Sequence, residues 1–179
     1  MAPSTYSVSF HTTKGSFTAR IDRDWSPNGA DRVYELVQSG YYNGVAFFRV
    51  LDGFVAQFGI SGDPALSAAW RERTIADDPV RASNTKGTIS FAMAGPGTRT
   101  TQLFVNLADN PRLDSMGFSP VAEITGGMDV VEALHGGYGE AAPRGNGPDQ
   151  GILQQRGNAY LRESFPRLDY IEQAIIADE

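Results

Sequence analysis

FFRVLDGFVAQFG, residues 47–59, is the stretch from which the fold can be worked out. It consists of two short apolar segments joined by Asp52-Gly53, and Asp-Gly between apolar segments is a strong signal for a β-hairpin. Side chains alternate between the two faces of a strand, so Phe47 and Arg49 are expected on one face and Phe48 on the other. The stretch therefore predicts a hairpin that carries an arginine among aromatic residues.

Two interpretations of Arg49 follow from the residues alone. On the return strand Val55 and Gln57 share a face, and a guanidinium beside a glutamine and aromatic rings can hold a polar group against an apolar pocket. Alternatively, Arg49 lies at a sheet edge with its aliphatic stem packed and its charged head in water. The hairpin by itself leaves both interpretations open.

Composition limits the possible functions. The 179 residues are most simply one domain, 1–179, and 41% apolar residues suit a globular core. A net charge of −6 argues against a nucleic-acid partner, which usually requires a basic surface. The absence of cysteine excludes disulfides, thiolate metal sites and a cysteine nucleophile.

Membrane and export signals are also missing from the sequence. No apolar run reaches the length of about 18 residues that a membrane span needs, so no membrane partner is expected. The start MAPSTYSVSF has neither the basic region nor the long apolar segment of a signal peptide. We therefore expect a cytoplasmic protein, or an extracytoplasmic one if a signal segment has been removed.

Further along the chain, alternating and helical patterns predict many short strands and two helices. Ser26-Pro27 starts a helix over 27–39, and a second helix is expected over 127–135. Residues 61–87 and the Gly/Pro-rich segment 136–166 are predicted to be surface excursions. Strands are expected at 6–12, 17–21, 88–94, 102–107 and 121–125, and a last strand over 168–177 is expected to pair with the first. This order favours a mainly β fold, an antiparallel sheet closed into a barrel and capped by two α-helices.

Motifs for hydrolytic, phosphate or redox chemistry are absent. The sequence lacks the nucleophile elbow, the P-loop and the dinucleotide fingerprint. His11 and His135 lack a third ligand at a matching spacing and do not predict a zinc site. Asp77-Asp78 is interpreted as a pair of solvated charges. The sequence thus predicts no metal and no cofactor.

Three blocks occur in a recognisable order: FFRVLDGFVAQFG, then FAMAGPGTRTTQLFVNL, then GGMDVVEAL. Together they resemble the cyclophilin family of peptidyl-prolyl cis-trans isomerases. The similarity runs from Tyr6 to Glu132 and resumes at the last strand. The excursions look like those of a bacterial branch, in which GYGE-x-A-P-R-G-x-G-P-D-Q is familiar, here at 137–150. The resemblance implies an eight-stranded closed barrel and an isomerase that assists protein folding.

By this resemblance, Arg49 takes the place of the catalytic arginine. The implied partners are proline-containing peptides and unfolded proteins, and a monomer is expected. Phe118 falls near the position where many relatives carry histidine, although one extra residue precedes Pro120. The other positions implied to bind substrate are Phe54, Val55, Gln57, Ala92, Met93, Gln102, Phe104 and Leu113.

Departures from the family pattern affect ligand binding. Arg112 stands where many relatives have tryptophan, Met93 where many have asparagine, and Val55 where many have methionine. In cyclophilins that bind cyclosporin tightly, the tryptophan meets the drug. The resemblance therefore implies only weak cyclosporin binding for this chain.

Two other functions compete with isomerase activity. A non-catalytic chaperone or scaffold module would bind proline segments without turnover, and the combination of Arg49, Gln57, Gln102 and Phe104 argues against it. A small-molecule-binding barrel of the lipocalin type would leave the ordered motifs unexplained.

Overall fold

The expected hairpin is present in the computed structural model, which describes residues 1–177. Strands β3 (Arg49–Leu51) and β4 (Val55–Phe58) pair antiparallel, with Arg49 opposite Gln57. Gly53 in the turn has φ of 72°, a backbone conformation that favours glycine. The turn signal and the apolar segments thus agree with the observed hairpin.

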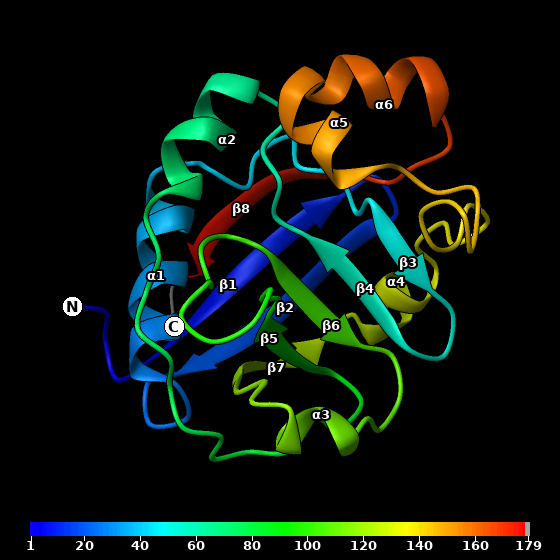
Figure 1. Ribbon diagram of the computed structural model, residues 1–179. Coiled ribbons are helices and arrows are strands. Elements are labelled where there is room, and N and C mark those ends of the chain that lie inside the picture. The colour runs from blue at the N-terminus through cyan, green and yellow to red at the C-terminus, as the bar shows by residue number, and fades with distance from the viewer. Residues whose placement is uncertain (178–179) are drawn as a thin grey trace.

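The eight strands within residues 1–177 belong to one antiparallel sheet, in the order β3-β4-β6-β5-β7-β2-β1-β8. The sheet curls around a core (Figure 1). The last strand pairs with the first, as the sequence predicts. The remaining strands are β1 (Thr5–Thr12), β2 (Gly15–Asp22), β5 (Thr88–Phe91), β6 (Leu103–Asn106), β7 (Pro120–Gly126) and β8 (Ile171–Ala177).

The predicted closure of the barrel is wrong, because the sheet is open and forms a half-barrel. Its edge strands are β3 and β8, and no continuous ladder joins them in the described part of the chain. The segment before β3 instead meets the start of β8 and the residues that precede it: Phe47 N donates to Asp169 O at 2.9 Å, and Ile171 N, at the first residue of β8, donates to Val45 O at 2.8 Å. With only three residues, β3 is too short to pair along the seven-residue β8 at the other edge.

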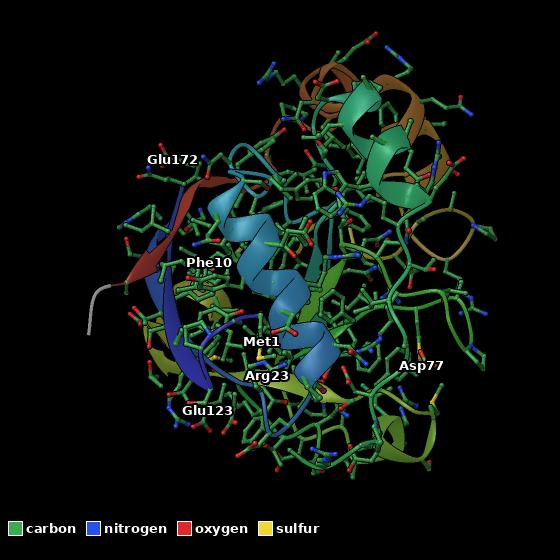
Figure 2. All side chains as sticks on the ribbon, turned by 90° about the vertical axis from the view of Figure 1, so that its left-hand side faces the viewer. Met1, Phe10, Arg23, Asp77, Glu123 and Glu172 are labelled. Atoms are coloured by element: carbon green, nitrogen blue, oxygen red, sulfur yellow. The ribbon has the colours of Figure 1, made fainter. Side chains whose placement is uncertain are left out.

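The main core fills the inner face of the curled sheet. The rings of Phe10 and Phe17 stack with centroids 4.8 Å apart, and Phe58 lies 6.0 Å from Phe10 (labelled in Figure 2) and 5.2 Å from Phe47. Phe47 therefore belongs to the core, and the expectation that it shares a face with Arg49 is wrong. Regular alternation begins only where β3 begins.

Six helices are present in residues 1–177, four more than the sequence predicts. The two expected ones are α1 (Pro27–Gln38) and α4 (Met128–Glu132), and both bury apolar side chains in the main core. The others are α2 (Pro64–Arg71), α3 (Arg112–Ser115), α5 (Gln150–Arg156) and α6 (Asn158–Ser164).

Three of these helices lie in the two predicted excursions. Helices α2, α5 and α6 gather at one end of the molecule (Figure 1). Two have acidic N-caps: Asp63 accepts a hydrogen bond from Ala65 N at 2.9 Å, and Asp149 accepts one from Ile152 N at 3.0 Å. Because Trp70 and Leu153 are buried, the excursions are packed structure rather than loose loops.

The N-terminus of α1 is capped by a residue from another segment. The Ser26 side chain makes no cap and instead donates to Pro120 O at 3.0 Å. The carboxylate of Asp78 accepts hydrogen bonds from the backbone of Asn28 and Gly29, at 3.1 and 2.9 Å. The segment that carries it runs beside α1, where Figure 2 labels its neighbour Asp77.

Asp78 is also the partner of a buried arginine. Arg99 Nη2 lies 3.0 Å from Asp78 Oδ2, and their side chains are only 5% and 1% exposed. Asp77 is exposed, so the interpretation of Asp77-Asp78 as solvated charges is correct for the first aspartate and wrong for the second. Asp78, which precedes β5, therefore contacts both the N-terminus of α1 and Arg99, which follows β5.

Within residues 1–177, no helix has both the length and the apolar character needed to cross a membrane.

Candidate functional site

The candidate site lies on the outer face of β3, β4 and β6, away from the main core. Along β4, Val55 and Gln57 line a pocket on this face, while Ala56 and Phe58 belong to the main core. On β6, Phe104 points to the pocket in the same way. Because side chains alternate along a strand, the same strands supply both the site and the core.

An apolar cluster forms the floor of the pocket. The rings of Phe104 and Phe118 meet edge to face with centroids 5.6 Å apart, and Phe104 is 5% exposed. The pocket has a volume of about 310 Å³, which suits a compact apolar group. The buried members of the cluster are Val55, Phe104 and Leu113, with Phe54, Ala92 and Phe118 packed partly buried against them.

Arg49 stands at one wall of this pocket and is held from two sides. Its Nη1 donates to Gln57 Oε1 at 2.9 Å. Its Nε and Nη2 donate to the carboxylate of Glu140, at 2.9 Å to Oε1 and 2.6 Å to Oε2. Such a two-point contact fixes the plane of a guanidinium. Arg49 is therefore not the loose edge arginine of the second interpretation.

The ion pair keeps Glu140 charged. The hydrogen bonds from Arg49 are the largest influence, and they lower the pKa of the Glu140 carboxyl below its ordinary 4.5. Burial acts in the opposite direction and is outweighed. At neutral pH the site therefore holds a guanidinium paired with a carboxylate.

A polar chain continues from Arg49 to the neighbouring strand. Gln57 Nε2 donates to Gln102 Oε1 at 2.8 Å, which sets the orientation of the Gln57 amide. Gly59 permits this contact, since a Cβ there would lie 2.6 Å from the Gln102 Cα and 2.4 Å from the Thr101 carbonyl oxygen. Glycine at the end of the hairpin thus allows residues 101–102 to approach β4.

All ten site residues expected from the sequence lie in this region. Gln102 stands one step behind the pocket, in contact with Gln57. Phe118 contacts Phe104 despite the uncertain alignment of its segment. Nine of the ten line the pocket itself: Arg49, Phe54, Val55, Gln57, Ala92, Met93, Phe104, Leu113 and Phe118.

Sequence reasoning missed three residues of the site. Met116 follows α3 and lines the pocket with its side chain largely exposed. Gln150, the first residue of α5, also lines the pocket, and Glu140 pairs with Arg49. Asp149 is an N-cap signal that would have placed Gln150 on a helix, but nothing in the spacing connects Glu140 with a residue 91 positions earlier.

Arg112, the most conspicuous departure from the family pattern, covers one side of the site. Its guanidinium carbon lies 5.2 Å from the ring centroid of Phe54, a cation–π contact at the rim. Arg112 itself is exposed. The position is therefore occupied by a charged group stacked on a ring rather than by a flat apolar surface.

A second, more polar cavity adjoins the first. It has a volume of about 400 Å³ and shares Gln57, Ala92, Met93 and Gln150 with the apolar pocket. Arg71 is its only charged residue and donates to Gln154 Oε1 at 2.6 Å. The two cavities are thus adjacent, one mainly apolar and the other mainly polar.

The described residues 1–177 contain no cluster of three or more side chains that could bind a metal ion. What they offer at the pocket is a fixed guanidinium beside an apolar floor. Such a site can favour one geometry of a bound group without making or breaking a covalent bond. Together with the curled antiparallel sheet, this arrangement suits an activity that changes conformation.

Comparisons with known proteins identify the family. The model of the cyclophilin type peptidyl-prolyl cis-trans isomerase family matches residues 7–150, so the chain belongs to this family, as the motifs predict. Peptidyl-prolyl cis-trans isomerase B of Escherichia coli is 30% identical over 138 residues, which cover 72% of this chain and 84% of that protein. The chain is thus an isomerase by its family, and its assignment to a bacterial branch stays a prediction.

Solved structures agree on the fold. The cyclophilin type peptidyl-prolyl cis-trans isomerase of Cryptosporidium parvum superposes with a TM-score of 0.70 at 19% identity, covering 98% of this chain and 99% of that one. A structure of the same protein in the presence of the dipeptide Ala-Pro gives a TM-score of 0.68 at 19% identity, with 97% and 99% covered.

Proposed function

We propose that this chain accelerates rotation about X-Pro peptide bonds in peptides and unfolded proteins, with the proline ring held in the apolar pocket and Arg49 as the catalytic residue. The observation that carries the proposal is the guanidinium of Arg49, fixed by Glu140 and Gln57 at the wall of that pocket. The Ala-Pro dipeptide used with the structural neighbour supports a ligand of this kind.

The reaction makes modest demands on the protein. An X-Pro bond isomerises over a barrier of about 18–20 kcal/mol, because twisting the amide breaks its resonance. At the twisted transition state the prolyl nitrogen becomes pyramidal and regains a lone pair. Arg49 can donate a hydrogen bond to that lone pair, which a planar amide does not offer, so the contact strengthens in the transition state. A preorganised charged donor of this kind contributes about 3–4 kcal/mol.

The apolar floor supplies the grip that the rotation needs. Phe104, Phe118 and Leu113 hold the ring while the preceding residue turns, and exclusion of water strengthens the contact with Arg49. One of the two amide N–H groups of Gln57 is used by Gln102, which leaves the other for a substrate carbonyl. The adjoining polar cavity receives residues before or after the proline.

The proposal extends to partners and assembly. The residues that line the pocket come from one chain, and we propose a monomer as the active form; size-exclusion chromatography with light scattering tests this. Because Arg112 presents a charged head where an aromatic contact would be needed, we propose weak cyclosporin binding.

The deciding experiment measures catalysis and binding on the same peptide. An NMR exchange assay on a proline tetrapeptide reports turnover, and chemical-shift titration reports binding. We expect exchange to accelerate strongly at catalytic protein concentrations and to be lost in Arg49→Ala. Binding without acceleration by the unmodified protein would replace the isomerase with a proline-binding scaffold.

A further inference from the structure

Glu140 lies in the motif at 137–150 but does not line the pocket, so its place in the site needs an explanation of its own. Its carboxylate takes the Nε and Nη2 groups of Arg49 with contacts of 2.6–3.1 Å. The two side chains come from segments 91 residues apart. Both side chains are about a quarter exposed, 25% for Arg49 and 27% for Glu140, so water only partly screens the pair. A two-point contact between such distant segments, made by a residue of the pocket wall, points to a role in the site.

The loop that carries Glu140 is built to hold it in place. Asn146 N donates to Tyr138 O at 3.0 Å and Gly147 N to Glu140 O at 2.9 Å, which closes the loop on itself. Gly145 also has to be glycine, because a Cβ at this position would clash with the Glu140 carbonyl oxygen.

The base of the loop is anchored to packed aromatic residues. The ring of Tyr138 meets His135 edge to face at 5.1 Å and Phe165 at 5.2 Å. Its hydroxyl accepts a hydrogen bond from Arg167 N at 3.1 Å. The carboxylate of Glu140 is therefore presented from a fixed support and not from a loose strand of chain.

Glu140 approaches the guanidinium from outside the pocket. Arg49 lines the pocket, whereas Glu140 does not. A guanidinium has five N–H groups: one on Nε and two on each terminal nitrogen. Glu140 engages Nε and one N–H of Nη2, and Gln57 engages one N–H of Nη1. One N–H on each terminal nitrogen stays available toward a ligand.

We infer that Glu140 is a positioning residue that holds the Arg49 guanidinium in the orientation required at the transition state. The inference rests on the proposed isomerase function. Without Glu140, the guanidinium keeps a single contact, to Gln57, and can rotate about its side-chain bonds. Each turnover would then have to order it first, which lowers kcat more than it changes substrate binding.

The test compares Glu140→Ala and Glu140→Gln with a matched control, Glu163→Ala. Glu163 also pairs with an arginine, Arg156, at 2.8 Å, but on the surface of α6 and away from the pocket. Turnover and binding of a proline tetrapeptide are measured separately by NMR line-shape analysis. The melting temperature and the NMR signal of the Arg49 Nε–H are recorded for each variant.

In Glu140→Ala we expect kcat to fall by about five- to tenfold with KM within about twofold, from loss of one ordered side chain. Glu140→Gln keeps one acceptor oxygen, so its kcat should lie between those of Glu140→Ala and the unmodified protein. The kcat of Glu163→Ala should match that of the unmodified protein. The Arg49 Nε–H signal should shift and exchange faster with water in Glu140→Ala only.

An unchanged or increased kcat in a folded Glu140→Ala variant would overturn the inference, and an increase would mean that Glu140 restrains Arg49. If Glu140→Ala does not fold, Glu140→Gln decides: full activity in that variant also overturns the inference. Absence of turnover by the unmodified protein would overturn the proposed function as well, so the two failures are distinguishable.

Discussion

Substituting Arg49 by alanine or lysine separates the catalytic contact from the structural one. In the structure the guanidinium contacts Glu140 through Nε and Nη2 and Gln57 through Nη1. Alanine removes all three groups. Lysine restores the charge as a single nitrogen, which can reach one of the two partners but cannot reproduce the planar fork.

The expected size follows from the contacts. Loss of a preorganised charged donor costs about 2.7–4 kcal/mol of transition-state stabilisation, so kcat/KM of Arg49→Ala should fall about 10²–10³-fold. Lysine should recover less than about tenfold of this loss. The ion pair with Glu140 is a quarter exposed and is worth at most about 1 kcal/mol, a change of about 2–4 °C in Tm for a chain of this size. A large catalytic defect with almost normal stability is the expected combination.

The assay is the NMR exchange measurement on a proline tetrapeptide, with Tm from thermal unfolding of the same samples. A folded Arg49→Ala variant that keeps kcat/KM within about threefold of the unmodified protein would refute the assigned role. Equal recovery by lysine would show that charge alone is sufficient and that the fixed fork has no part in catalysis.

The other predictions concern the pocket, pH, drug binding and the fold. Phe104→Ala should weaken peptide binding at least tenfold in a titration and lower stability by about 2–4 kcal/mol, because a nearly buried ring is lost beside an open pocket; unchanged affinity excludes the ring from the site. Because the pKa of Glu140 is lowered, its ion pair is intact above the ordinary value of 4.5 and is lost only as pH falls through the lowered value. The rate of exchange should therefore be flat between about pH 6 and pH 9 and fall only in acid, and a bell-shaped profile in that range would reveal an acid–base pair. Arg112→Trp should bind cyclosporin at least tenfold more tightly in an inhibition titration, whereas nanomolar inhibition of the unmodified protein would contradict the role given to Arg112. Asp78→Ala should lower the free energy of unfolding by about 3–5 kcal/mol, because it leaves Arg99 buried without its partner and the α1 N-terminus without its cap; a loss below 1 kcal/mol would mean that water replaces both contacts.

Local signals predicted the parts of the fold that depend on neighbouring residues. Asp52-Gly53 located the hairpin, and Val55 and Gln57, expected on one face of the return strand, both line the pocket. The ordered motifs then led to site residues that the structure brings together. These predictions depend on contacts within a strand or between adjacent strands.

Local signals do not predict contacts between segments that are far apart in the sequence. The cap of α1 comes from Asp78, about 50 residues away, whereas the start signal in the sequence is the neighbouring Ser26-Pro27. Glu140 and Arg49 are 91 positions apart, and only the tertiary fold brings them together. Closure of the barrel depends on the length of β3 and the register at its edge, and a pattern of short strands does not specify either.

The alternation along β4 and β6 has a consequence for how this protein can change over time. Val55 and Phe104 can be exchanged for other side chains, and substrate preference with them, without touching Ala56 or Leu103 on the opposite face. An insertion of a single residue in either strand would instead move the following side chains to the opposite face, so that pocket residues would face the core and core residues would face the pocket. Substitutions at the pocket positions can therefore change the substrate preference of this site, whereas a change in the length of β4 or β6 would disrupt the fold.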